Sequence, residues 1–402
     1  MAAKEFSANG LARTHRVLSG YVNRGTVPGL VAAVAKGDST HVEVLGRRDL
    51  DRGESMSRDS IFRIASMSKP ITAVAALMLV EDCVLRLDDP VDELLPELAD
   101  RKVLKRPDGP LDDTVPADRP ITLRDLLTFR AGFGAVWDPT WPIVAAMQES
   151  GIGVSPPRMT PEPAPAPDQY LGRLGKLPLI HQPGGGWLYH SGIAVAGVLI
   201  ARASGRSFPE FLRKRIFEPL GMDDTGFHVP PDKQDRFVAM YRADKDSGGL
   251  SLFDPAEGGK WSEPPLFPDG GGDLVSTVDD YLAFARLLMN GGQYSGTRLL
   301  SRPTVELLAT DQLTDENKRD SALTPGQWDA AGWGFGVQVT TARTGAASVG
   351  RYGWNGGLGS YWFNDPREQL IGILLTQRAW DSPKPPAVCT DFETCAYAAL
   401  AA

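Results

Sequence analysis

The sequence contains few cysteines. Only Cys83, Cys389 and Cys395 occur in 402 residues, which is too few for a disulfide framework and typical of a reducing compartment. Pairing or metal binding by Cys389 and Cys395 is a less common alternative to isolated thiols. The histidines are also scattered, without the spacing that a zinc site needs; they are His15, His41, His181, His190 and His228. The sequence therefore predicts neither a metal nor another cofactor.

The chain lacks an excess of positive charge and any long apolar run. Its formal net charge of −8 argues against a nucleic-acid partner, because such proteins gather Lys and Arg on one face. No segment approaches about 18 uncharged apolar residues, and the first residues contain no continuous apolar core of a secretion signal. We expect a cytoplasmic protein that binds neither nucleic acid nor membrane, of unspecified oligomeric state.

Several common catalytic signatures are missing from the sequence. There is no Gly-x-Ser-x-Gly elbow, so an α/β-hydrolase is not supported. No phosphate-binding loop or dinucleotide fingerprint follows any expected strand. Any catalytic chemistry must therefore rest on another constellation.

Hydrophobic spacing predicts strands near both ends of the chain. A helix is expected over residues 11–25, followed by strands over 27–35 and 41–46. Near the other end, strand-like runs occupy 334–340, 359–364 and 369–375, and a last helix is expected over 392–401. This order predicts one sheet assembled from both ends of the chain and interrupted by a helical insertion.

The middle of the chain is rich in Pro and Gly but contains helical segments. The run from Pro156 to Tyr170 is expected to have no regular structure. Thr277, followed by Asp280, predicts the start of a helix that ends at two glycines. Helical spacing also occurs over 121–129, 193–203 and 208–217.

These patterns predict two domains. An α/β sheet domain is expected from residues 1–100 and 290–402, and a mostly helical domain from 101–289. The helical domain contains a long Pro-rich loop, from about Pro139 to Pro183, that we expect to shape the mouth of a cleft.

Ser66 and Lys69 form the one Ser-x-x-Lys pair in the chain. This spacing places both side chains on one face of a helical turn, where the amine can take the hydroxyl proton. The pair opens the most apolar segment of the sequence, and burial there would lower the pKa of Lys69. The residues alone leave two interpretations open: a nucleophile with its base, or a capped helix end with a solvent-facing lysine.

Four further segments follow the Ser66 helix in a characteristic order. They are PITLRDLLTFRAGF (120–133), PGGGWLYHSGIAVAGVLI (183–200), GGGDLVSTVDDYLAFARLLMNGG (270–292) and GWNGGLGSYWFNDP (353–366). With this order the chain resembles the serine β-lactamase superfamily over roughly residues 10–380, and most of all the class C β-lactamase-like family VIII carboxylesterases and their acyltransferase relatives. The resemblance implies an α/β (α+β) fold like that of β-lactamases and penicillin-binding proteins. In that fold, a mostly antiparallel sheet is flanked by helices, and the active site lies between it and a helical domain.

The resemblance also implies roles for the residues of the first two motifs. Ser66 becomes the nucleophile and Lys69 its general base. Tyr189-His190-Ser191 occupies the place of a Tyr-x-Asn motif, so Tyr189 is expected to pass protons between Lys69 and the leaving group. His190 is expected to be a loop residue, because Lys69 and Tyr189 already fill the proton-transfer roles.

The third motif departs from the pattern of β-lactamases. Trp354, Asn355 and Gly356 stand where those enzymes have Lys-Thr-Gly, and Ser191 replaces the usual asparagine; these four residues are expected to bind substrate. The missing lysine and amide weaken the case for penicillin-like or D-Ala-D-Ala substrates. The amides of Gly357 and Ser66 are expected to form the oxyanion hole.

Two further features near these motifs are given structural interpretations. Alternation along a strand places Arg351 on the face opposite Trp354, where we expect a structural role. The glycines at 270–272 are expected to form a tight turn beside the cleft.

The resemblance implies a serine hydrolase that cleaves small-molecule carboxylic esters through an acyl-enzyme on Ser66. One alternative is an acyltransferase of secondary metabolism, which passes the acyl group to an alcohol or amine. Another is a weak β-lactamase or D-aminopeptidase. A non-catalytic binding protein on the same fold is the fourth possibility, although such a protein has little reason to bury a lysine.

Overall fold

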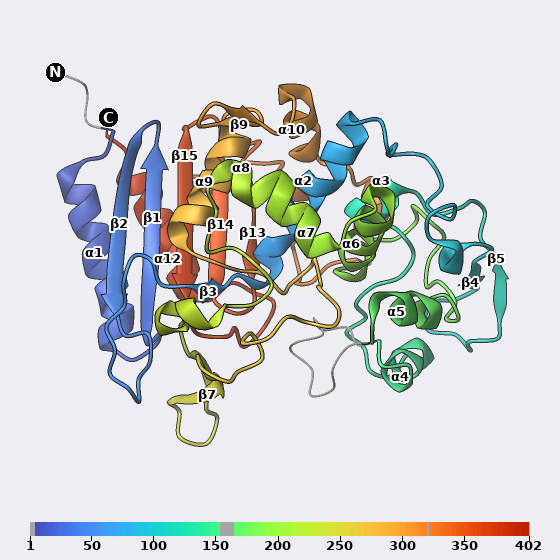
Figure 1. Cartoon of the computed structure of the whole chain (residues 1–402), viewed down its shortest axis with the longest axis horizontal. Coiled ribbons are helices and arrows are strands. Elements are labelled where there is room, and N and C mark those ends of the chain that lie inside the picture. The colour runs from blue at the N-terminus through green and yellow to red at the C-terminus, as the bar shows by residue number, and fades with distance from the viewer. Residues whose placement is uncertain (1–4, 153–164, 320, 402) are drawn as a thin grey trace.

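The computed structural model describes residues 5–152, 165–319 and 321–401, which are built around a seven-stranded sheet (Figure 1). All its neighbouring strands are antiparallel, in the order β11-β12-β13-β14-β15-β1-β2. β1 pairs with β15 and thereby joins the two ends of the chain, as predicted. The strands are β1 (Gly29–Lys36), β2 (Ser39–Gly46), β11 (Ala331–Trp333), β12 (Gln338–Thr340), β13 (Tyr352–Gly356), β14 (Ser360–Asp365) and β15 (Leu370–Thr376).

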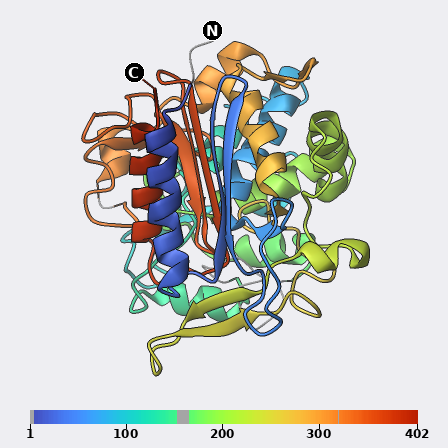
Figure 2. The same cartoon turned by 90° about the vertical axis from the view of Figure 1, so that its left-hand side faces the viewer.

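The two faces of the sheet pack against different helices, because side chains alternate along each strand. Leu30 and Val34 of β1 pack with helices α1 (Ala8–Asn23) and α12 (Ala387–Ala398). Val31, on the other face, belongs to the main core, together with residues of α9 (Val278–Met289). Figure 2 shows α1 and α12 together on one side of the sheet.

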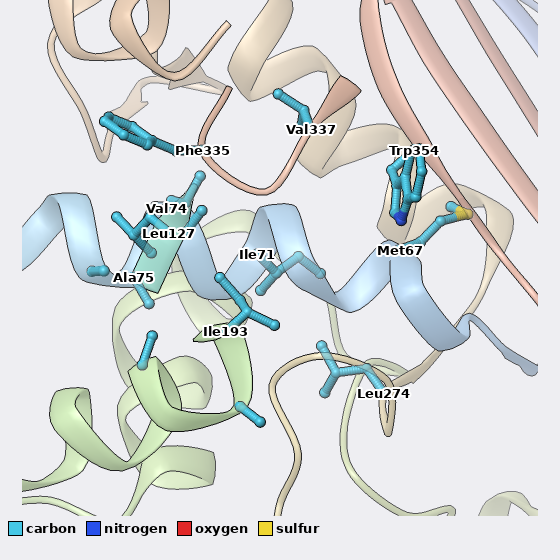
Figure 3. Close-up of a cluster of buried hydrophobic side chains, with 14 of the residues drawn as sticks. Met67, Ile71, Val74, Ala75, Leu127, Ile193, Leu274, Phe335, Val337 and Trp354 are labelled. Carbon is cyan, nitrogen blue, oxygen red and sulfur yellow. The ribbon is translucent and has the colours of Figure 1, made fainter. Parts of the chain in front are cut away.

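Helix α2 (Ser68–Glu81) runs through the main core and carries the predicted site. It follows a short 3-10 turn, Ala65–Met67, and its residues from Ser68 to Leu79 are all buried. A helix that is apolar on every side is expected to be surrounded by other elements. Figure 3 shows Leu127 of α3 (Leu123–Leu127) and Ile193 of α6 (Ser191–Ser204) beside it.

Smaller elements surround this core. Within the described residues, the remaining helices are α4 (Pro142–Glu149), α5 (Pro167–Leu174), α7 (Phe208–Leu212), a π-helical turn (Arg213–Phe217), α8 (Glu218–Leu220), α10 (Arg302–Leu308), α11 (Asp315–Lys318) and the 3-10 turns Pro96–Leu98 and Pro231–Arg236. Four short ladders pair β3 (Phe62–Arg63) with β8 (Val275–Ser276), β4 (Lys102–Leu104) with β5 (Thr114–Pro116), β6 (Met240–Ala243) with β7 (Leu250–Asp254), and β9 (Gln293–Tyr294) with β10 (Thr297–Arg298). The β3–β8 pair matters most for function, because it brings the glycine-rich loop before β8 next to the turn that bears Ser66.

Most of the predicted elements are confirmed, including the start of α9. The Thr277 side chain accepts a hydrogen bond from the amide of Asp280. The single strand predicted over 334–340 is wrong, because the chain turns at Gly336, whose φ is +71°, and forms the hairpin of β11 and β12. A Cβ at Gly336 would lie 2.9 Å from the carbonyl oxygen of Lys69, so this turn closes tightly on α2.

The Pro-rich loop contains more regular structure than predicted. The prediction that residues 156–170 have no regular structure is wrong at the C-terminal end of this run. Pro167 begins α5 there, at a helix position where proline is well tolerated. Residues 153–164 of this loop lie outside the described residues. The division into two domains stays a prediction; α9, which it assigned to the helical part, packs against the sheet.

Among the described residues there is neither a helix that could span a membrane nor a cluster of metal-binding side chains. No helix there is both long and apolar enough to cross a lipid bilayer. Nor do the same residues contain a group of three or more His, Cys, Asp or Glu side chains that could hold a metal ion.

Candidate active site

Ser66 lies on a strained turn at the start of the buried helix. The preceding residue, Ala65, has a φ of +45°, which is uncommon for any residue but glycine. The ends of β13 and β14 hold this turn: Ser360 Oγ donates to the carbonyl oxygen of Ile64 at 2.7 Å. A Cβ on Gly356 would lie 2.3 Å from that same oxygen, so only glycine allows this approach. Ser66 itself is partly exposed.

The Lys69 side chain is completely buried and points at Ser66. Its Nζ donates to Ser66 Oγ at 2.9 Å and to the carbonyl oxygen of Gly271 at 2.5 Å, and it lies 3.1 Å from Nδ1 of His190. These three acceptors match the three N–H groups of an ammonium. The interpretation of Lys69 as a solvent-facing cap is therefore wrong.

Burial also changes the acid–base behaviour of Lys69. Loss of hydration lowers its pKa from the ordinary value of 10.5 to about 7, although the negative charge of Asp269 acts in the opposite direction. A large fraction of the amine is then neutral near pH 7. Neutral Lys69 can accept the proton of Ser66, as general-base catalysis requires.

Tyr189 completes the contacts of the Ser66 hydroxyl. Its hydroxyl accepts a hydrogen bond from Nε1 of Trp354 at 2.8 Å and is hydrogen-bonded to the Ser66 side chain. Lys69 Nζ lies 4.5 Å from the centre of the Tyr189 ring. Burial raises the pKa of Tyr189, so the phenol is neutral near pH 7. Because Trp354 donates to it, the phenol proton is available to Ser66 Oγ.

His190 is the main site residue that the sequence interpretation missed. The sequence predicts a loop residue, and His190 does lie in a bend directly before α6, but its buried ring lies between Lys69 and Asp269, with Nε2 3.0 Å from Oδ2 of Asp269. Its backbone has φ +80° and ψ −65°, and Ser191 N donates to the carbonyl oxygen of Tyr189 at 3.2 Å. These values define a γ-turn of the rare, strained type.

The glycine-rich loop at 269–273 holds the other side of Lys69. The Asp269 carboxylate is fully buried, and its Oδ1 accepts the amide of Gly271 at 2.7 Å. A Cβ on Gly271 would lie 2.8 Å from the His190 ring, so glycine is required for this close approach. The acid next to a glycine run was the sequence signal that could have pointed to this part of the site.

Gly357 and Ser66 present two backbone amides. Gly357 is exposed and directly follows Gly356, which contacts the Ser66 turn. Within the described chain, neither the amide of Gly357 nor that of Ser66 has a backbone hydrogen-bond partner. Both are therefore open to an incoming oxygen, and nothing lies within 4 Å of a Cβ built on Gly357.

The other predicted substrate residues lie in different surroundings. Ser191 is buried, and its hydroxyl is hydrogen-bonded to Tyr170, so the structure does not bring it to Ser66. Trp354 is mostly buried against Tyr189. Asn355 is half-buried and, with Trp354, borders a pocket of about 200 Å³.

Arg351 lies behind the sheet, as the alternation of β13 predicts. Its guanidinium is 2.7 Å from Glu393 of α12 and 2.7 Å from the hydroxyl of Tyr361. These partners account for its charge without a substrate.

The comparison with known families agrees with this geometry. A fold in which a partly exposed serine is followed three residues later by a buried lysine and faces a tyrosine defines a class of serine enzymes that work through an acyl-enzyme. The sequence profile of the Beta-lactamase family matches residues 14–387. The chain therefore belongs to this family, and the predicted resemblance and fold are confirmed.

Individual relatives place the chain near esterases. It is 39% identical over 346 residues to an uncharacterised protein of Mycobacterium tuberculosis (85% of this chain, 83% of the relative). It is 31% identical to the lovastatin esterase of Penicillium rubens over 89% of this chain and 90% of that protein. Among solved structures, EstCE1, described as a hydrolase with promiscuous acyltransferase activity, superposes with a TM-score of 0.79 at 23% identity, over 97% of this chain and 99% of that one.

Proposed function

We propose that the protein is a serine esterase that cleaves small-molecule carboxylic esters through an acyl-enzyme on Ser66. The observation that carries this proposal is the 2.9 Å contact between Ser66 Oγ and the fully buried Nζ of Lys69. Neutral Lys69 takes the hydroxyl proton while Ser66 Oγ attacks the ester carbonyl. The carbonyl oxygen becomes an oxyanion, which must be stabilised.

The amides of Ser66 and Gly357 are proposed to bind this oxyanion. Their lack of backbone partners in the described chain supports the assignment. One such donor typically contributes about 10²–10³ in rate. Trp354, Asn355 and Gly356 lie on the strand that leads to Gly357, which supports their proposed place along the bound substrate.

Tyr189 is proposed to pass the proton from Lys69 to the leaving alkoxide. Its hydroxyl contacts Ser66 Oγ, so it lies beside the bond that breaks when the tetrahedral intermediate collapses. In the second half-reaction, water attacks the acyl group, and the same groups return the proton to Ser66. Each half-reaction therefore ends with Lys69 neutral.

An ester is a better substrate class for this site than a β-lactam or a D-amino peptide. Trp354 replaces a lysine of the third motif, so the site lacks a cation at that position for the carboxylate that those substrates carry. The relative from Penicillium rubens is named for its action on an ester. A non-catalytic role fits poorly, because burying Lys69 is costly to the fold and serves no purpose without chemistry.

An acyltransferase is the second candidate. Hydrolysis and acyl transfer share the acyl-enzyme and differ only in the acceptor that discharges it. The partial exposure of Ser66 leaves the acyl group open to an alcohol or amine as well as to water. The acceptor must therefore be identified by experiment.

Intact-protein mass spectrometry after incubation with short p-nitrophenyl esters tests the proposal. We expect an acyl adduct in the wild type and none in Ser66→Ala, while the exposed control Ser382→Ala behaves as wild type. Rapid loss of the adduct in water indicates an esterase, whereas a persistent adduct removed by added alcohol or amine indicates a transferase. The absence of an adduct in the wild type would refute the acyl-enzyme.

A cytoplasmic location is also proposed. Cys83, Cys389 and Cys395 are all free thiols, which supports a reducing compartment. Fractionation of the native host's cells, followed by detection of the protein, would test this location.

A further inference from the structure

Lys69 faces three acceptors of different character. Ser66 Oγ is the reacting atom, the carbonyl oxygen of Gly271 can only accept, and Nδ1 of His190 accepts in just one tautomer. A neutral amine has two N–H groups and one lone pair. The lone pair points at Ser66 only if both N–H groups are taken by Gly271 and His190.

The tautomer of His190 therefore decides whether the Lys69 lone pair points at Ser66. Its Nδ1 accepts from Lys69 only when the ring proton is on Nε2, the nitrogen that lies 3.0 Å from Oδ2 of Asp269. Apart from this contact, Oδ2 has no hydrogen-bond partner in the described part of the chain. At Oδ2, the fully buried carboxylate therefore serves to accept the Nε2 proton, which fixes the tautomer of His190.

We propose that His190 and Asp269 are positioning residues that hold the lone pair of neutral Lys69 on the Ser66 hydroxyl. This inference rests on the proposed acyl-enzyme chemistry. In the acylation step the Ser66 proton moves to the Lys69 lone pair, and the resulting ammonium donates to Ser66, Gly271 and His190. The charge of Asp269 stabilises that ammonium, and no proton leaves His190.

The backbone supports this role independently. His190 occupies a strained γ-turn, and strain of this kind persists when surrounding contacts fix it, often at functional sites. Gly271 cannot carry a side chain without meeting both the His190 ring and Asp269. The fold therefore holds the imidazole between the carboxylate and the amine from both sides.

Other titratable groups also face this pair. Tyr189 lies beside Lys69, the charge of Asp269 helps to raise the pKa of Tyr170 of α5, and the amide of Asp269 donates to the carboxylate of Asp273 at 3.3 Å. Burial raises the pKa of both tyrosines, so neither loses its proton near pH 7. Asp269 and Lys69 are therefore the groups with which His190 interacts most directly in this pH range.

Asp269→Asn is the sharpest test, because it preserves the shape of the side chain while it removes the negative charge and turns one acceptor oxygen into an N–H donor. The Asn amide still accepts from Gly271, but its NH₂ now donates to Nε2 of His190. The ring proton then moves to Nδ1, which donates to Lys69 and draws its lone pair away from Ser66. The analogous change in serine proteases, which also produces a wrong tautomer, costs about 10⁴ in kcat. We expect a loss of at least about 100-fold in the acylation rate, with KM little changed.

Variants of His190 separate positioning from packing. His190→Asn places an amide oxygen near the position of Nδ1, accepts from Lys69 and cannot tautomerise, so it should retain more activity than His190→Ala. For the same reason, Asp269→Asn should cost far less in the His190→Asn background than in the wild type, because only the effect of its charge on Lys69 remains there. A merely structural role predicts neither the rescue nor this non-additivity.

The measurement is the rate of Ser66 labelling by a fluorophosphonate, followed from pH 5 to 9, with unfolding midpoints for every variant. The exposed Asp108→Asn is the matched control and should equal wild type. In the Asp269→Asn variant, the rise of the labelling rate with pH should occur at lower pH than in the wild type, because the charge of Asp269 stabilises protonated Lys69.

The outcomes separate this inference from the proposed function. A wild type that is not labelled refutes the acyl-enzyme itself. If the wild type is labelled and Asp269→Asn reacts within about threefold of it with the same pH profile, the positioning role is wrong. If Asp269→Asn fails to fold, the comparison of His190→Asn with His190→Ala decides: rescue supports the role, and equal loss overturns it.

Discussion

The pH dependence of Ser66 acylation follows from the burial of Lys69. Only the neutral amine accepts the Ser66 proton, and burial lowers the pKa of Lys69 to about 7. The neutral fraction is then about 10% at pH 6, about half at pH 7 and about 90% at pH 8. The acylation rate should therefore rise about tenfold per pH unit below pH 6.5 and level off above pH 8.

The magnitude of this effect can be set against an ordinary lysine. With a pKa of 10.5, an exposed amine is neutral in roughly one molecule in 3,000 at pH 7. Burial thus increases the supply of base by about 10³, comparable to the 10²–10⁴ that general-base catalysis typically contributes. Methionine has a similar length and carries no base, so the Lys69→Met variant should lose activity by about the 10²–10⁴ that general-base catalysis contributes.

Stopped-flow acylation by a p-nitrophenyl ester under single-turnover conditions measures the relevant step. Ester hydrolysis without enzyme, subtracted at every pH, gives the baseline, and Ser66→Ala should not exceed it. A rate that is flat from pH 5.5 to 8.5, or one that rises only near pH 10, would refute the assignment of buried Lys69 as the base.

Other predictions concern stability and proton transfer. Because the pKa of Lys69 is lower in the folded chain than in the unfolded one, the unfolded chain binds more protons between pH 7 and 10.5. The free energy of unfolding should therefore rise with pH in this range by up to about 1.4 kcal/mol per pH unit. In urea titrations, the Lys69→Met variant should lose this slope. Tyr189→Phe should lower kcat by about 10²–10⁴, as expected for loss of a proton-transfer group, in steady-state assays. Trp354→Phe removes the N–H that donates to Tyr189, together with part of the buried indole ring. A smaller loss of about tenfold in kcat is expected, in line with one hydrogen bond. Asp254→Ala removes the carboxylate that pairs with the buried Arg63 guanidinium and should cost about 3–5 kcal/mol of stability in urea unfolding.

The sequence predicts the parts of the fold that depend on local pattern. Alternating strands near both termini are enough to predict that one sheet joins the two ends, and the pairing of β1 with β15 confirms it. Ser66 and Lys69 can also be recognised in the sequence, because a three-residue spacing at the start of an apolar helix is a local pattern. The hairpin at Gly336 was missed because its turn is set by contact with α2, a feature of packing that no short window contains.

His190 and Asp269 could not be recognised as partners of Lys69 from spacing. They lie 121 and 200 residues further along the chain than Lys69, and only the folded structure brings them together. Each also has an ordinary local interpretation, a loop histidine and an acid before a glycine turn. What distinguishes them is complete burial next to a buried amine, and burial at a loop is set by tertiary packing rather than by the residue's neighbours.

Backbone strain is another feature that the local sequence does not predict, and it explains how the site is held. Among the described residues, Ala65, Phe129 and His190 have positive φ and adjoin the site: Ala65 precedes Ser66, Phe129 packs on the Tyr189 ring, and His190 contacts Lys69. None is a glycine, so composition gives no warning of these conformations. Each costs of order 1–3 kcal/mol and persists only where neighbouring contacts leave no alternative. The glycines at 271 and 356 make those contacts possible, because each lets a neighbouring segment press on a strained turn. The strain therefore lies in the scaffold that fixes the serine, the amine and the phenol, and the geometry of the hydroxyl is set before a substrate arrives.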